Sequence, residues 1–151
     1  MPEGILNDLH EDHEEVSGLI EQLIKTEDGK ERGTIFKEMM SKLLAHSHAE
    51  QNVLYKKMEK SENEKSRTFA YEGENEHQIV EQQLQQMARA RNKASEQWTA
   101  QAVVLRELVN HHVKEEEETG FRCAAAEFDA ATLEKLGEQF RRQKEKLLTE
   151  T

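Results

Sequence analysis

The chain has 151 residues, a length typical of one domain built around a single hydrophobic core. Its formal net charge of −10 argues against a nucleic acid or an anionic membrane as partner, because both require a basic protein surface. A single cysteine excludes an internal disulfide and a thiolate metal cage, and neither a signal-peptide pattern nor a long apolar run occurs. We therefore expect a soluble cytoplasmic protein.

The composition predicts an all-α protein. The chain has one proline, at position 2, and is rich in Glu, Lys, Gln, Leu and Ala, which are good helix formers. Hydrophobic residues make up 35% and charged residues 34%, the balance expected when each helix buries one stripe and exposes the remainder. The apolar residues recur at helical spacing, and no alternating strand pattern is present.

Four long helices are expected, over about 2–26, 34–60, 66–93 and 95–119. Thr34 and Ser95 are predicted N-caps, and Thr119-Gly120 is a predicted C-terminal stop. A short segment over 121–128 and a last helix over about 130–148, capped by Asp129, should pack across the bundle. The sequence thus predicts an up-down-up-down antiparallel four-helix bundle (about 3–120) with a C-terminal helical extension (121–151), all in one domain over 1–151.

One histidine interrupts the apolar row of each of the four long helices: His13, His46, His77 and His112. They are 33 (13 to 46), 31 (46 to 77) and 35 (77 to 112) residues apart, and the midpoints fall where the chain is expected to turn. Residues equidistant from the turn of an antiparallel helical hairpin lie at the same height. The four imidazoles should therefore meet at one level of the bundle core.

Glu50 and Glu116 follow His46 and His112 by four residues, which places each carboxylate one helical turn from an imidazole on the same face. Clustered uncharged imidazoles would leave buried nitrogens unpaired, whereas a cation would satisfy them together. Imidazole and carboxylate without thiolate suit iron, manganese or zinc. This number of ligands exceeds what one zinc takes and favours a pair of metals bridged by the two glutamates.

Four runs, LHEDHEEV, LLAHSHAEQNVLY, ENEHQIVEQQL and LVNHHVKEEEETGF, resemble in type and order the four helices of the hemerythrin-like (HHE cation-binding) domain. The resemblance covers about residues 5–121. It implies that His13, His46, His77 and His112 are metal ligands, that Glu50 and Glu116 bridge the metals, and that the cofactor is two iron ions with an oxo or hydroxo bridge.

The sequence departs from the family pattern in the third helix. Oxygen-carrying hemerythrins have a further histidine four residues before the one matched by His77, and this chain has Gly73 there. We expect Glu81, one turn after His77, to supply an oxygen ligand instead, with Glu74 as the poorer alternative. Such a site disfavours reversible dioxygen carriage and favours peroxide or nitric oxide handling, or the sensing and storage of iron or oxygen.

Several other residues near these motifs receive minor roles: Val109 as an apolar wall of the small-ligand pocket, His10 as a marginal neighbour of the site, His48 and His111 at the surface, and Tyr55 and Tyr71 as peripheral. Either tyrosine could still donate a hydrogen bond near a bound oxygen species.

The favoured function is a di-iron protein, monomer or homodimer, that binds dioxygen, peroxide or nitric oxide. A binding protein is preferred over a peroxidase or catalase-like enzyme. The alternatives are a metal-free or zinc-binding acidic helical interaction module, and a ferritin-like site. The ferritin-like class needs two Glu-x-x-His pairs, and only Glu74 with His77 offers one.

Overall fold

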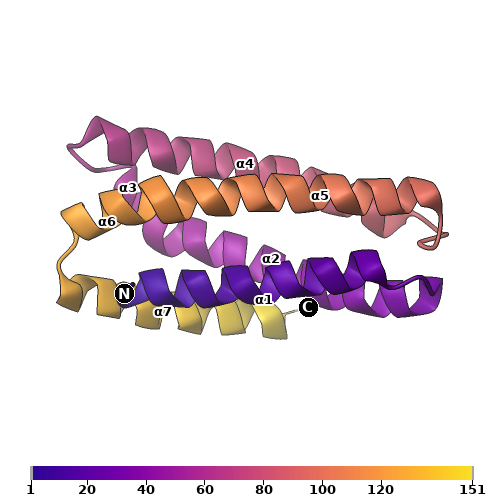
Figure 1. The fold of residues 1–151 in the computed structure, drawn as a ribbon. Helices are drawn as coiled ribbons and strands as arrows, with labels where there is room; N and C mark the ends of the chain where they lie inside the picture. Colours follow the sequence, from indigo (N-terminus) through magenta and orange to yellow (C-terminus); the bar gives the residue numbers. More distant parts are fainter. Residues whose placement is uncertain (1, 151) are drawn as a thin grey trace.

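The computed structural model describes residues 2–150, and all regular structure within that range is helical (Figure 1). This confirms the prediction of an all-α protein. The helices are α1 (Ile5–Lys25), α2 (Gly29–Glu50), η1 (Gln51–Tyr55), α3 (Lys56–Met58), α4 (Glu64–Arg89), α5 (Glu96–Glu115), η2 (Glu116–Gly120), α6 (Phe121–Glu127) and α7 (Ala130–Thr149). The two η segments are single π-helical turns, and both continue the preceding α-helix without a break.

The four long helices α1, α2, α4 and α5 lie alongside one another, and successive ones run in opposite directions (Figure 1). The last helix, α7, packs against α1 and α2. It therefore covers one side of the molecule and leaves the α4–α5 side without a further layer.

Side-chain N-caps fix where four of the helices begin: Asp28, Asn63, Ser95 and Asp129 each accept a hydrogen bond from a backbone N–H of the first turn. The predicted caps Ser95 and Asp129 are confirmed. The prediction of Thr34 as a cap was wrong, because Asp28 accepts from the backbone N–H of Glu31 and α2 starts at Gly29. The turn between the first two helices is therefore shorter than the sequence indicated.

The predicted stop at Thr119-Gly120 was also wrong, since the chain continues through the π-helical turn η2 into α6. Gly120 has a helical φ of −61° and is required for packing. A Cβ atom built on it would lie 2.3 Å from Cζ of Phe69. The glycine admits the phenyl ring and does not end the helix.

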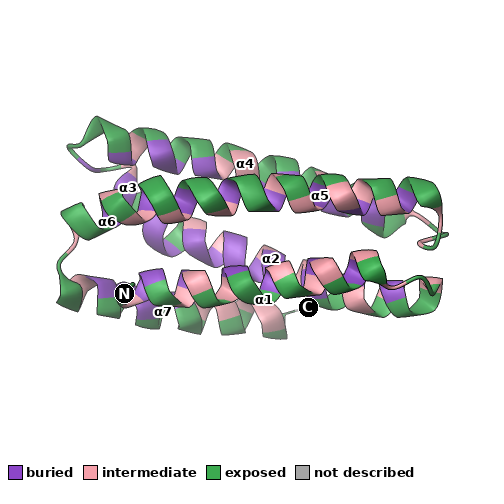
Figure 2. Cartoon of the chain, viewed as in Figure 1, coloured by how far each residue is buried: buried purple, intermediate pink, exposed green. Residues whose placement is uncertain are grey.

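The core consists of two apolar clusters separated by a polar layer. One cluster joins the start of α1 to η1, α3, α6 and α7, and the other fills the opposite half between α1, α2, α4 and α5. Figure 2 shows the buried positions as stripes along these helices. The polar layer between the clusters contains the four histidines singled out by the sequence, so the fold isolates them from bulk water on both sides.

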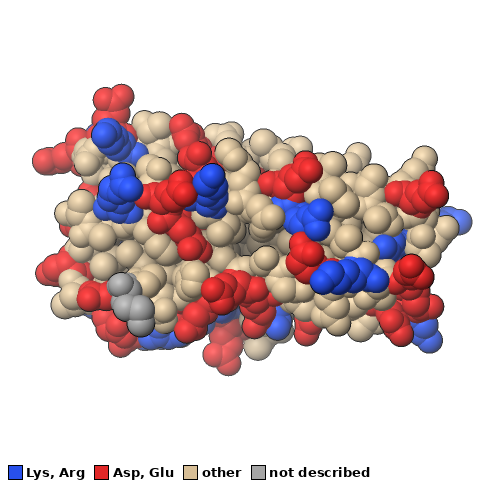
Figure 3. Space-filling view, in the orientation of Figure 1, with Lys and Arg blue, Asp and Glu red and all other residues tan. Residues whose placement is uncertain are grey.

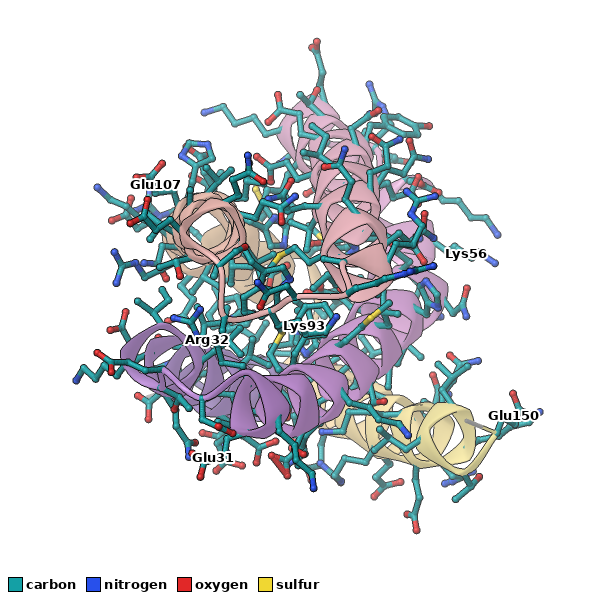
Figure 4. All side chains as sticks on the ribbon, turned by 90° about the vertical axis from the view of Figure 1, so that its right-hand side faces the viewer. Glu31, Arg32, Lys56, Lys93, Glu107 and Glu150 are labelled. Carbon is teal, nitrogen blue, oxygen red and sulfur yellow. The ribbon has the colours of Figure 1, made fainter. Side chains whose placement is uncertain are left out.

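A buried arginine holds the connections at the end opposite α6. Arg32 donates hydrogen bonds to the backbone oxygens of Thr26, Ile24 and Lys93 and to the hydroxyl of Thr99, and its guanidinium lies over the Trp98 ring. Figure 4 views this end, with Arg32 and Lys93 labelled beside the α4–α5 connection. One side chain thus links the α1–α2 turn to the α4–α5 turn.

The surface carries charges of both signs. On the face drawn in Figure 3, Asp and Glu side chains are spread along the molecule with Lys and Arg between them. Between residues 2 and 150, no helix is both long and apolar enough to cross a membrane.

Candidate metal centre

Four buried histidines, one from each long helix, form the centre of the polar layer: His13, His46, His77 and His112, all 3–7% exposed. They are arranged in two pairs, with ring centroids 5.1 Å apart for His13 and His46 and 4.8 Å apart for His77 and His112. The Nε2 atoms of His77 and His112 are 3.2 Å apart. The structure brings together the four histidines that the sequence placed at one level.

Two glutamates lie between the histidine pairs, and both are almost completely buried. Oε1 of Glu50 is 3.7 Å from Nε2 of His46 and 3.2 Å from Nε2 of His77. Glu116 lies between the other two histidines, 3.0 Å from Nε2 of His13 and 3.8 Å from Nε2 of His112. Each carboxylate therefore reaches one histidine of each pair, which is the arrangement that a bridging ligand needs.

These six side chains form two groups whose ligand atoms lie within 4.8 Å of one another: His13, His46 and Glu116, and Glu50, His77 and His112. Each group offers two imidazole nitrogens and one carboxylate oxygen. Such a donor set suits a divalent or trivalent iron, manganese or zinc ion and keeps coordination positions open for a further ligand.

The outward-facing Nδ1 atom of every clustered histidine has a hydrogen-bonding partner: Glu117 for His13 (2.7 Å), Asp12 for His46 (2.9 Å), Gln51 for His77 (2.7 Å) and Glu76 for His112 (2.6 Å). A partner on Nδ1 fixes the ring orientation and leaves Nε2 with a lone pair directed inward. The outer partners therefore preset all four imidazoles to bind cations through Nε2.

The site repeats itself between the α1–α2 and α4–α5 halves, with corresponding residues in the same order along the chain: Asp12 with Glu76, His13 with His77, His46 with His112, Glu50 with Glu116, Gln51 with Glu117, and Tyr55 with Phe121. Two of these pairs differ in chemistry. His13 has a carboxylate outside, Glu117, and a phenyl ring, Phe121, at 6.5 Å. His77 instead has the neutral amide of Gln51 at its Nδ1 atom and a phenol, that of Tyr55, stacked on its ring.

That phenol, Tyr55, was expected to be peripheral, but the structure places it within the cluster. It is 0% exposed, stacks on His77 with a centroid distance of 5.3 Å, and donates a hydrogen bond of 2.5 Å to Oε2 of Glu116. The π-helical turn η1 places it there, because the five-residue step from Glu50 keeps Tyr55 on the inner face. The equal spacing from Glu116 to Phe121, through η2, was a sequence signal for this position.

Tyr55 also occupies the space in front of Gly73. A Cβ atom on Gly73 would lie 2.6 Å from Cε2 of Tyr55 and 2.8 Å from its hydroxyl oxygen. The position that carries a histidine in the family pattern is thus filled by a phenol from η1. The glycine in mid-helix is explained by this close approach.

The structure does not bring Glu81 into the cluster, and its role in place of the missing histidine stays a prediction. Its carboxylate lies 3.5 Å from Nε2 of the surface residue His48. The reason is helix direction. Because α4 runs opposite to α2 and α5, a step of four after His77 leads away from the level of Glu50, whereas a step of four back, to Gly73, leads toward it.

The remaining candidates lie outside the cluster. His10 hydrogen-bonds to Glu117, on the outer side of His13, and His111 lies 3.7 Å from Glu76 and is largely exposed. Burial and the neighbouring Glu59 raise the pKa of Glu74 to about 7. Glu74 belongs to neither of the two ligand groups found among the described residues, which disfavours the ferritin-like alternative.

Several buried groups of the site have pKa values shifted away from their ordinary ones. Burial and the neighbouring Glu116 raise the pKa of Glu50 well above its ordinary value, and burial together with His112 lowers the pKa of His77 well below its own. Burial likewise lowers the pKa of His46 and raises that of Tyr55. Burial opposes the charged form at each of these positions. At Glu116 burial is outweighed by the neighbouring side chains of Glu50 and His13, which lower the pKa well below its ordinary value, and a bound cation would stabilise the ionised form of both carboxylates.

Buried polar atoms without a hydrogen-bond partner also indicate a cation site. Within the described part of the chain, Nε2 of His13, both oxygens of Glu50 and Oε1 of Glu116 have no hydrogen-bond partner. His13 and Glu116 approach to 3.0 Å, but without hydrogen-bonding geometry. Buried polar atoms without partners are rare and costly in folded proteins. The residues present therefore fit a metal pair.

A small cavity of about 20 Å³ adjoins the histidines, and neither Glu50 nor Glu116 lines it. It is lined by the histidine cluster, Asp12 and Ser47, and by apolar side chains from all four long helices: Val16, Leu43, Val80, Val109 and Val113. Val109 was predicted as such a wall. A space of this size holds a water or a diatomic molecule.

The fold and the site together define a helical protein with a buried histidine and glutamate cation site. Residues 4–124 match the hemerythrin HHE cation binding domain, so the chain belongs to that family. The match covers the four long helices and ends before α7. Comparisons with curated proteins and with solved structures gave no match.

Proposed function

We propose that this protein is a cytoplasmic non-haem di-iron protein that binds dioxygen or a related small ligand, nitric oxide or peroxide, at the buried metal centre. The observation that carries the proposal is the pair of three-residue ligand groups with unpaired Nε2 and carboxylate atoms. A metal-free interaction module would leave these atoms buried without partners at a cost of about 1–3 kcal/mol each. The proposal treats the whole chain, α7 included, as one up-down-up-down bundle domain with an added helix.

In the proposed site, His13 and His46 hold one iron and His77 and His112 hold the other, while Glu50 and Glu116 each reach both positions. Bound iron would supply the redox chemistry toward the small ligand. The protein supplies the rest: outer partners that fix each imidazole, apolar clusters on both sides that exclude water, and a cavity of diatomic size. The apolar lining favours dioxygen or nitric oxide over a larger or charged ligand.

Tyr55 is proposed as an additional oxygen donor at the position formed by Glu50, His77 and His112. Its hydroxyl lies 3.5 Å from Nε2 of His112 and donates to Glu116. It takes the role that the sequence analysis gave to Glu81. An oxygen donor in place of a fifth imidazole stabilises the oxidised metal, which favours sensing, storage or peroxide handling over reversible carriage.

The test is metal analysis combined with an optical spectrum. Anaerobic loading with ferrous iron should give two irons per chain, and oxygen should produce new absorption. Recovery of the starting spectrum on removal of oxygen supports reversible binding, and loss of added peroxide supports turnover. Two zinc or manganese ions retained in place of iron would change the proposed cofactor.

The matched control uses neighbouring histidines. His112→Gln should lose iron, whereas His111→Gln, which changes a side chain that is 68% exposed, should keep both irons. A wild-type protein that binds no iron, or two variants that behave alike, would contradict the proposal.

A further inference from the structure

The helix α7 lies outside the region that matches the family, yet it contacts the candidate metal centre. It packs against α1 and α2, the two helices that carry His13 and His46. The ring of Phe140, 0% exposed, meets the His46 ring edge-on with centroids 5.6 Å apart. One side of this imidazole is therefore built by the C-terminal helix.

One turn further along α7, Lys144 contacts the outer partner of the same histidine. Its Nζ atom lies 2.8 Å from Oδ1 and 2.9 Å from Oδ2 of Asp12, and Oδ2 accepts the 2.9 Å hydrogen bond from Nδ1 of His46. The lysine also lies 5.3 Å from the centre of the Phe140 ring. Asp12 is thus held on both oxygens by an ammonium group while it orients the imidazole.

This arrangement differs from that of the other outer carboxylates. Glu117 and Glu76 are shared with the surface histidines His10 and His111. The side chain of Asp12 is 16% exposed, and its ammonium partner comes from a helix remote in sequence. A partly buried carboxylate keeps one orientation more reliably when a lysine engages both oxygens.

We propose that α7 contributes to metal binding: Lys144 holds the Asp12 carboxylate in place, and Asp12 orients the His46 ring so that its Nε2 atom faces the metal. The inference rests on the proposed metal binding. It assigns Lys144 as a positioning residue that acts through Asp12 and His46. Because His46 belongs to the group with His13 and Glu116, this metal position depends on α7 more than the other one does.

The helix itself does not depend on Lys144 for its place. Leu133, Leu136 and Phe140 are buried in the core cluster, and Arg141 forms a 2.5 Å ion pair with Asp8. Gly137 lets α7 approach Asp8 closely, since a Cβ atom there would lie 2.7 Å from Oδ2 of that residue. Lys144→Met should therefore remove the contact to Asp12 and leave α7 docked.

The first test measures iron binding. Ferrous iron is titrated anaerobically into the full chain against a competing chromogenic chelator, so that the two binding steps are resolved. Lys144→Met should weaken one step about ten-fold, toward the lower end of the effect of removing an outer partner, and leave the other unchanged. Lys144→Arg should restore it, and Lys146→Met, at an exposed lysine of the same helix, should match the wild type.

The second test needs no metal. In the metal-free protein, long-range nitrogen–proton NMR correlations should show His46 as the tautomer protonated on Nδ1. Lys144→Met should shift it toward a tautomer mixture, with circular dichroism and melting temperature close to those of Lys146→Met.

The outcomes separate the two proposals. A wild-type protein that binds no iron overturns the proposed function, while the tautomer result still decides whether Lys144 positions His46. Two iron-binding steps in Lys144→Met that equal those of Lys146→Met, together with an unchanged His46 tautomer, overturn the role of α7. Equal weakening of both steps with a lowered melting temperature also overturns it, because that result indicates general destabilisation.

Discussion

Replacing Tyr55 by phenylalanine tests the centre through a single oxygen atom. The hydroxyl donates a 2.5 Å hydrogen bond to Oε2 of Glu116, and Oε1 of the same buried carboxylate already has no hydrogen-bond partner. The variant keeps the ring and its stacking on His77 and removes the donor. A hydrogen bond to a charged group contributes about 1.5–3 kcal/mol, so the metal-free protein should lose about 2–3 kcal/mol of unfolding free energy.

The assay is urea unfolding of metal-free protein, with thermal melting as a second readout. The expected fall in melting temperature is roughly 5–10 °C for a chain of this size. Tyr71→Phe is the matched control: Tyr71 is 51% exposed, and its loss should stay within about 0.5 kcal/mol. In ferric protein, Tyr55→Phe should also lose visible phenolate-to-iron absorption. A Tyr55→Phe protein as stable as the control, with an unchanged spectrum, would refute the reasoning.

Three further substitutions test other parts of the structure. Gly73→Ala should lower the unfolding free energy by about 1–2 kcal/mol in urea unfolding, because its Cβ meets the buried Tyr55 ring. Gly18→Ala, whose Cβ meets nothing within 4 Å, should raise it by about 0.5–1 kcal/mol. Equal effects of the two substitutions would contradict the packing argument. Arg32→Met should cost about 2–3 kcal/mol of unfolding free energy, because it leaves buried carbonyl oxygens unpaired. Arg106→Met, in the surface ion pair with Glu21, should cost about 1 kcal/mol or less. Comparable losses in the two variants would contradict the role of Arg32 in linking the two turns. The raised pKa of Glu74, about 7 against an ordinary 4.5, means that its folded-state contribution is full below about pH 4.5 and is lost as pH rises through about 7. Glu74→Gln should therefore raise the melting temperature relative to wild type at about pH 8.5 more than at about pH 5, and a pH-independent difference would contradict this assignment.

The sequence determined the helical architecture and much of the buried histidine and glutamate cluster. Helical periodicity and equal spacing were sufficient to single out the four histidines, because antiparallel helices convert equal distances from a turn into equal heights. The four-residue steps to Glu50 and Glu116 were equally local, since one turn of the same helix joins each glutamate to its histidine.

The tertiary structure decided the features that depend on helix direction and on contacts between distant segments. Glu81 lies outside the histidine cluster and Tyr55 lies within it because α4 runs opposite to α2, and because a π-helical turn inserts one residue after Glu50. No helical periodicity could place Lys144 beside Asp12, 132 residues away along the chain. The sequence alone thus determined what repeats within a helix, and only the packing of helices decided which side chains complete the centre, since that depends on where separate helices meet.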